Sequence, residues 1–204
     1  MCPAGLKCYA LASAKESIDG VFLSCTMEVH VLRLGHRPSR DKRLTTHLIL
    51  AARAFGASGA TYTGRRDPTL EETISDVVSD WGGSFSLGYS EGWRRLISGW
   101  EGKVVHLTMY GQPVGEAISS IRDDPSDKLV VVGGAKVPGE VYGLADWNVS
   151  VTLQPHSEVS AFAVFLHELF EGRELDRVFE GARMRIAPQE RGKRVEGKPG
   201  GSKI

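Results

Sequence analysis

Residues 154–158, Gln-Pro-His-Ser-Glu, place an amide, an imidazole, a hydroxyl and a carboxyl directly before an apolar segment. His, Ser and an acid are the residue types of a hydrolase triad, but triad partners normally come from separate parts of a chain. Neighbours in sequence also rarely point at each other. We therefore interpret Ser157 as a helix N-cap and Glu158 as a first-turn acid, which the helix dipole favours.

A glycine pair offers a second kind of chemistry. Gly133 and Gly134 follow the apolar run of residues 128–132, so a ligand could approach the backbone there and accept hydrogen bonds from its amides. Pro138 favours a helix N-terminus facing the same crevice. This fits a nucleotide-like ligand, although two glycines also make the tight turn that most such loops need. GGAKVP matches neither GxGxxG nor GxxxxGK[ST].

The stretch LRLGHRPSRDKR, in the loop expected after the first strand, holds five basic residues, Arg33, Arg37, Arg40, Lys42 and Arg43. The formal net charge is zero, but residues 33–66 carry eight Lys and Arg against one acid, and residues 183–204 carry seven against two. Residues 67–182 carry eight against nineteen. This distribution suggests a polyanion such as RNA or DNA, because Arg forks onto phosphates. Solvated loops and a basic tail explain the charges equally well.

Strand-like apolar runs alternate with segments of helical period, which predicts an α/β fold with a mostly parallel sheet and helices on both faces. Ligands of such sheets lie outside the carboxyl ends of the strands, so the loops after strands should form the site. Strands are expected within residues 28–34, 60–64, 85–89, 103–111, 128–134 and 147–153, and helices within 45–56, 69–83, 91–100, 114–124, 138–146 and 157–172.

Several element ends carry their own signals. Thr69 followed by Glu72 has the spacing of a capping box, and Gly172 is expected to close the last long helix. Beyond that helix, residues 176–189 predict a short β-hairpin around Glu180-Gly181.

The last long helix is apolar nearly all round, so it must be covered on both sides. A second subunit of a homodimer is one cover, and a central position inside one domain is the other.

The length and composition favour one domain, residues 27–190, between an extension at 1–26 and a basic flexible tail at 191–204. The three cysteines all fall in the extension, at spacings that fit neither a zinc site nor a disulfide framework. No run is long enough for a membrane helix, and we expect a cytoplasmic protein. We predict no metal, because the histidines are scattered, namely His36, His47, His106 and His156.

Five blocks in this order resemble the archaeal tRNA (cytidine 56)-2′-O-methyltransferases of the SPOUT superfamily, 56 being a position in tRNA. They are LRLGHRPSRDKRLTTH, ARAFGA, VVHLTMYG, GGAKVPGEVYGLADWNV and QPHSEVSAFAV, and the resemblance runs from about Met27 to Arg194. It implies a deep trefoil knot in the C-terminal part of the fold, which is a rare exception among protein chains. It also implies a homodimer, and tRNA rather than DNA as the partner.

The resemblance further implies that S-adenosylmethionine binds in the knot loops. Gly134 and Ala135 depart from the family pattern, where we expect Ala and an acid, and Thr152 and Leu153 replace a usually smaller or more polar pair. Carried over residue by residue, the cofactor positions are Leu107, Gly133, Gly134, Ala135, Lys136, Val137, Val151, Thr152, Leu153, Gln154, Pro155, His156, Ser157 and Glu158.

For the transfer step we expect Arg40 or Arg43 to orient the ribose 2′-oxygen and to stabilise its developing negative charge. Arg stays protonated, so it is a poor base, and Glu158 and His156 are the remaining candidates for proton transfer. Two rivals stay open. One is a methyltransferase of the same fold with another RNA target, and the other is a non-catalytic RNA-binding protein.

Overall fold

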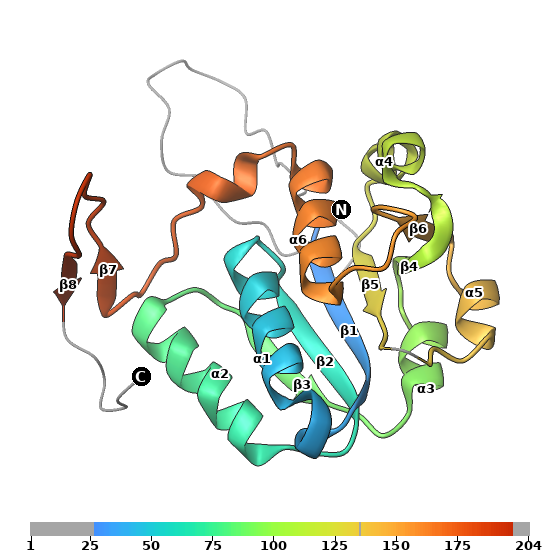
Figure 1. Ribbon diagram of the computed structural model, residues 1–204, viewed down its shortest axis with the longest axis horizontal. Helices are drawn as coiled ribbons and strands as arrows, with labels where there is room; N and C mark the ends of the chain where they lie inside the picture. Colours follow the sequence, from blue (N-terminus) through green and yellow to red (C-terminus); the bar gives the residue numbers. More distant parts are fainter. Residues whose placement is uncertain (1–26, 135, 198–204) are drawn as a thin grey trace, which may run out of the picture.

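The computed structural model describes residues 27–134 and 136–197, and the N-terminal extension with all three cysteines lies outside them (Figure 1). Six parallel strands form one sheet in the order β3-β2-β1-β5-β4-β6, so the expected α/β fold is confirmed. The strands are β1 Val29–His36, β2 Gly59–Gly64, β3 Ser86–Tyr89, β4 Lys103–Pro113, β5 Lys128–Val132 and β6 Trp147–Ser150. The helices are α1 Pro38–Ala54, α2 Pro68–Trp81, α3 Trp93–Ser98, α4 Val114–Asp123, α5 Glu140–Leu144 and α6 Glu158–Phe170.

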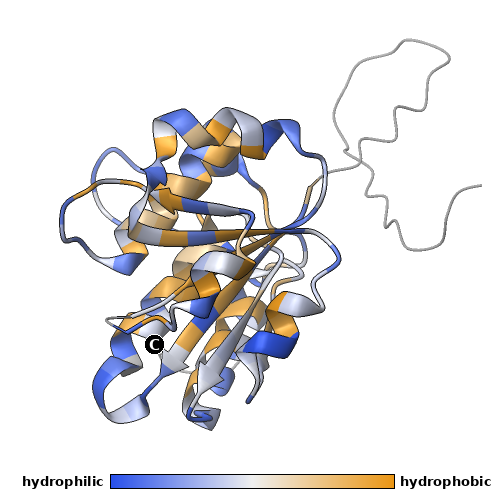
Figure 2. Ribbon diagram, turned by 90° about the vertical axis from the view of Figure 1, so that its right-hand side faces the viewer, coloured by the Kyte–Doolittle hydropathy of each residue, from blue (hydrophilic) through white to orange (hydrophobic). Residues whose placement is uncertain are grey.

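The two faces of the sheet are separated by the alternation of side chains along each strand. On β1, Val31 belongs to the core under α1, α2, α4 and α6, whereas Leu32 belongs to the core under α3 and α5. On β5, Val130 and Val131 divide in the same way. Figure 2 shows the apolar residues gathered in the sheet and on the helix sides that face it. Helices therefore cover both faces, as the sequence predicts.

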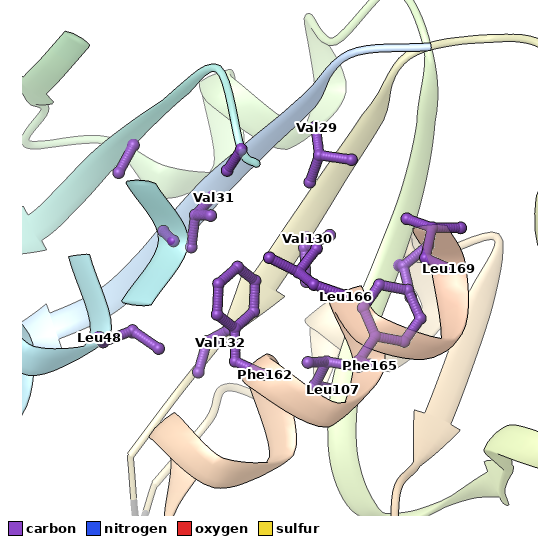
Figure 3. Close-up of a cluster of buried hydrophobic side chains, with 14 of the residues drawn as sticks. Val29, Val31, Leu48, Leu107, Val130, Val132, Phe162, Phe165, Leu166 and Leu169 are labelled. Carbon is purple, nitrogen blue, oxygen red and sulfur yellow. The ribbon is translucent and has the colours of Figure 1, made fainter. Parts of the chain in front are cut away.

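Helix α6 is the centre of the larger core (Figure 3). Phe162, Phe165 and Leu166 are fully buried against the sheet, and α6 also contacts α1 and α4. The sheet and the neighbouring helices of the same chain thus cover most of the apolar surface of α6. Val164 is the exception, because 43% of its surface is exposed.

Strand β4 spans the strand expected within residues 103–111, and its pairing with β6 is irregular. Leu107 pairs with Val149 of β6, and Gln112 pairs with Val149 as well, so the register shifts between them. Between these two pairings the chain forms a bulge, and it then pairs with β6 again.

Two of the predicted helix ends are confirmed and one is wrong. Ser157 caps α6 by accepting a hydrogen bond from the Val159 amide at 3.3 Å, and Gly172, with φ 79°, follows its last turn. The capping box at Thr69 is not formed. Asp67 caps α2 instead, and its carboxylate accepts from the amides of Thr69 and Leu70. Pro68 then occupies the first turn, where its missing N–H costs nothing.

The C-terminal hairpin exists but uses other residues than expected. Strand β7 Met184–Ile186 pairs antiparallel with β8 Val195–Gly197, so β8 lies inside the segment predicted as a tail. Residues 180 and 181 do form a turn, but the prediction that it joins the two strands of the hairpin is wrong. The Glu180 carbonyl instead accepts a hydrogen bond from the Gly83 amide, which holds this segment at the end of α2.

Upstream of the hairpin, a short 3-10 helix η1 (Arg173–Asp176) leads to Arg177, which donates to the carbonyl of Gly56 at 2.5 Å. Residues 173–197, which we call the C-terminal arm, are thus held by hydrogen bonds at the ends of α1 and α2. Within the described ranges, no helix has the length and apolar character needed to span a membrane.

Candidate active site

A cavity of about 750 Å³ lies at the carboxyl edge of β4, β5 and β6. Its floor consists of Leu107, Val132 and Val149, which pair with one another across the three strands. The segments that leave these strands form the walls. A cavity of this size and position is typical of the ligand site in an open parallel sheet.

The structure brings the three segments that hold the predicted cofactor positions together around this cavity, namely the end of β4, residues 133–137 and residues 151–158. Eight of the predicted residues line it, namely Leu107, Gly133, Gly134, Lys136, Val137, Val151, His156 and Glu158. Thr152 to Pro155 and Ser157 do not line it and are exposed, and Ser157 is occupied as the cap of α6. Ala135 falls in the gap between the described ranges.

The sequence analysis missed several wall residues. Thr108, Met109 and Tyr110 lie in the bulge of β4, inside an expected strand to whose side chains the sequence analysis assigned no role. Ala161 lies three residues after Glu158, on the same side of α6, and helical spacing could have found it. Tyr142 on α5 also lines the cavity, and no local signal distinguishes it.

A chain of hydrogen bonds fixes one wall. Tyr142 OH and Thr108 Oγ1 lie 3.0 Å apart, and the side-chain Nδ2 of Asn148 donates to the backbone carbonyl of Tyr142 at 2.9 Å. His106 Nδ1 lies 2.8 Å from Asn148 Oδ1. Burial lowers the pKa of His106, which favours the neutral imidazole, and the hydrogen bond to Asn148 opposes this shift. The chain ties the bulge of β4 to α5 and β6, so it holds the wall in one arrangement.

An ion pair, Arg33 with Glu158, lies behind the glycine loop. Arg33 Nη2 is 3.7 Å from Glu158 Oε2, and the side chains are 2% and 22% exposed. Arg33 is on the α6 side of β1 because it shares the alternation of Val29 and Val31. A Cβ atom placed on Gly134 would lie 3.4 Å from Glu158 Oε1 and 3.6 Å from Arg33 Nη2, so the loop packs directly on the pair.

The pair is electrostatically incomplete. Among the described residues, Arg33 Nε and Nη1 and Glu158 Oε2 are buried without a hydrogen-bond partner. Burial raises the pKa of the Glu158 carboxyl, Arg33 opposes the rise, and Asp41 adds to it. Glu158 is therefore an acceptor of raised basicity on the cavity wall, and it can complement a cationic ligand.

The basic stretch is not the loop that the sequence predicts. Arg33 is buried within β1, and Arg40 and Arg43 lie in the first turns of α1, because the helix already begins at Pro38. Both α1 arginines are exposed, and neither lines the cavity. The Arg37 guanidinium hydrogen-bonds Asp41 and lowers the pKa of that carboxyl.

The cavity offers backbone amides at Gly133 and Gly134, apolar floor residues for a flat ring, and the Glu158 carboxyl. In the described part of the chain, no three His, Cys, Asp or Glu side chains are grouped so that they could hold a metal ion. The arrangement suits a nucleoside-like ligand that carries a positive charge.

Comparison with known proteins shows the family to which the chain is similar. Residues 81–196 match the family described as tRNA ribose 2′-O-methyltransferase, aTrm56. The tRNA (cytidine(56)-2′-O)-methyltransferase of Methanothermobacter thermautotrophicus is 57% identical over 170 residues, which cover 82% of this chain and 95% of the relative. The same-named protein of Methanopyrus kandleri is 53% identical, covering 81% and 94%.

The chain belongs to the aTrm56 family of tRNA ribose 2′-O-methyltransferases. The resemblance stated from the sequence is thereby confirmed.

Solved structures support the fold of this aTrm56 member. The A. aeolicus TrmH/SpoU tRNA modifying enzyme superposes with a TM-score of 0.54 at 11% identity, covering 73% of this chain and 77% of the other. The AdoMet-bound rRNA methyltransferase from Sinorhizobium meliloti gives 0.51 at 21% identity, covering 72% and 57%. The α/β architecture of the SpoU methyltransferases is therefore shared.

Proposed function

We propose that this aTrm56 member methylates the ribose 2′-oxygen of cytidine 56 in tRNA with S-adenosylmethionine as the donor. One observation carries the proposal. The cavity at the ends of β4, β5 and β6 is built from the loops that hold the family blocks, and relatives with this name are more than 50% identical.

The residues of the cavity fit the donor. When bound, the donor supplies an activated methyl group on a positively charged sulfur. The glycine loop offers amides and close backbone approach, the floor offers apolar contacts, and Glu158 offers a negative charge. A volume of about 750 Å³ holds a molecule of this size. We therefore assign to the donor site the predicted cofactor positions that line the cavity, namely Leu107, Gly133, Gly134, Lys136, Val137, Val151, His156 and Glu158.

Positioning supplies most of the rate in this proposal, because the transfer needs the ribose oxygen in line with the methyl group. Arg40 and Arg43 are assigned an electrostatic role towards the ribose and its phosphates. Both are exposed at the start of α1, which follows β1, the neighbour of the cavity strand β5, so in this proposal they act once RNA is bound. Both predicted proton acceptors line the cavity, and we favour Glu158 because it is partly buried with a raised pKa, whereas His156 is exposed.

The function is tested by incubating an unmodified tRNA transcript with labelled donor and mapping the modified nucleotide. A ribose methyl at cytidine 56 is expected. A methyl at another nucleotide or on a base nitrogen would support the rival target. If calorimetry gave no saturable heat with the donor, the chain would be a binding protein without this activity.

Arg40→Ala and Arg43→Ala are each expected to lower kcat about 100-fold, as the loss of one preorganised donor to a developing negative charge does. Single-turnover assays with saturating tRNA measure this. Arg191→Ala is the control, because its side chain is 93% exposed on the C-terminal arm and should leave kcat unchanged. Wild-type turnover in both α1 variants would remove them from the mechanism.

We further propose that the protein is a homodimer and that it is cytoplasmic. In each chain we propose that the C-terminal part is tied in a trefoil knot. Exposed apolar residues favour an interface along α6 and the C-terminal arm, since a lone two-stranded hairpin is marginally stable. They are Val164, Leu175, Val178, Ile186 and Val195.

Light scattering is expected to give twice the chain mass of 22.2 kDa. Val164→Glu should shift the protein towards the monomer, because a charge would be buried at the interface. The matched control is Leu144→Glu on α5, where the side chain is 40% exposed and away from α6. If the wild type is a monomer, or if Val164→Glu dimerises with the same affinity as the wild type, the proposed interface is wrong.

A further inference from the structure

The carboxyl edge of the sheet has two halves with different chemistry. The donor cavity occupies the ends of β5, β4 and β6. The segments after β1, β2 and β3 form the other half, and in Figure 1 the starts of α1 and α2 and the link from β3 to α3 lie along the lower margin. Because β1 pairs with β5, the two halves meet at these strands.

Each of the three segments in the second half carries exposed arginines, and these fall into two classes. Arg37, Arg66 and Arg94 are paired, with Asp41, Glu71 and Glu140 respectively. The others are exposed and form no ion pair with any residue in the described ranges. We call them the cationic rim, which consists of Arg40, Arg43, Arg65 and Arg95.

The acids of these segments do not cancel the rim. Asp41 and Asp67 are buried, and each has a partner. Glu91 is the exposed acid among residues 37–43, 64–67 and 90–95. The field above this half of the edge is therefore positive, although the whole chain has a net charge of zero.

The end of β3 also provides a recess with an aromatic wall. A hollow of about 630 Å³ is lined by residues 90–95, which include Trp93 and Arg95. The Arg94 guanidinium lies 4.4 Å from the centre of the Trp93 ring and hydrogen-bonds Glu140 at the start of α5. This contact links the hollow to the helix that follows the glycine loop of the donor site. Arginines beside an aromatic ring are the usual contacts for a nucleic-acid backbone and its bases.

We propose that Arg65, Arg95 and the hollow of residues 90–95 bind the sugar-phosphate backbone of the RNA substrate outside the target nucleotide. This inference rests on the proposed function. The target nucleotide enters the cavity half of the edge while the flanking RNA lies along the cationic rim. Arg65 and Arg95 therefore contribute affinity and orientation, and they take no part in the transfer step.

The test is the salt dependence of tRNA binding by the full chain, measured by fluorescence anisotropy without donor. For Arg65→Ala/Arg95→Ala we expect roughly tenfold weaker binding, and a slope of log Kd against log salt that is smaller by about 2. Donor affinity by calorimetry should stay at the wild-type value, because neither residue lines the donor cavity.

The control is Lys103→Ala/Arg173→Ala, which removes two positive charges elsewhere that, unlike the rim arginines, are paired, with Asp146 and Glu171 respectively. Lys103 begins β4 at the amino edge, and Arg173 begins η1. An unchanged slope in the rim variant, or an equal change in the control, would overturn the inference. Because binding is measured without donor, a wild type that binds tRNA with the expected slope and fails to methylate cytidine 56 would refute the proposed function alone.

Discussion

Arg33→Met is expected to destabilise the protein by about 3 kcal/mol at pH 8 and by much less near pH 5. The variant leaves the carboxyl of Glu158 half-buried on the cavity wall without its cationic partner, while the repulsion from Asp41 remains. Chemical denaturation at the two pH values measures the difference.

The pH dependence follows from the direction of the shift. Burial raises the pKa of Glu158 above its ordinary value of 4.5, and loss of Arg33 raises it further. Below the unfolded pKa the carboxyl is neutral in both states and costs nothing. Above the unfolded pKa the carboxyl ionises freely in the unfolded chain, whereas in the native state it either keeps its proton or becomes a poorly compensated buried charge. The free energy of unfolding therefore falls as the pH rises through the folded pKa. The gap between variant and wild type therefore opens above about pH 4.5.

Two further variants separate this explanation from simple loss of packing. Glu158→Gln strands Arg33, which stays protonated, and removes the carboxyl whose pKa is raised in the wild type, so its destabilisation should become smaller, not larger, between pH 5 and pH 8. Arg33→Met/Glu158→Gln removes both charges, and most of the stability at pH 8 should return. If Arg33→Met costs the same at pH 5 and pH 8, the pair does not control this carboxyl.

Gly111→Ala is expected to cost about 3 kcal/mol, at the upper end for overpacking, and to abolish donor binding. A Cβ atom on Gly111 would lie 2.5 Å from the Asn148 carbonyl carbon and from the Val149 amide nitrogen. These are backbone atoms of β6 and cannot rotate away, so the part of β4 that follows the bulge must move away from β6. The bulge of residues 108–110 and its bond to Tyr142 would then be lost from the cavity wall.

Thermal unfolding and calorimetric titration with the donor measure both effects. Gly115→Ala is the matched control, four residues away in the first turn of α4, where an added Cβ meets nothing within 4 Å. It should be neutral or stabilise by up to about 1 kcal/mol, since Ala suits a helix better than Gly. Normal donor binding by Gly111→Ala would show that the close approach to β6 does not shape the site.

Local preferences along the chain determined much of the fold. Hydrophobic period distinguished strands from helices, and Ser157 before an apolar helix predicted its own cap, because such interactions act within a few residues. The same alternation placed the glycine loop and residues 154–158 at one edge of a sheet. Long blocks in a preserved order then identified the family.

Only the tertiary structure decided which side chains meet across the sheet. The strand order set Arg33 against Glu158 and brought Tyr142 to Thr108, and hydrophobic period does not encode that order. The cap at Asp67 also escaped prediction. Thr69 is an equally good N-cap candidate in the local sequence. Asp67 is the cap in the structure, where Tyr62 OH accepts a hydrogen bond from the Asp67 amide at 2.9 Å. Contacts of this kind depend on packing between distant segments, which no short stretch of sequence specifies.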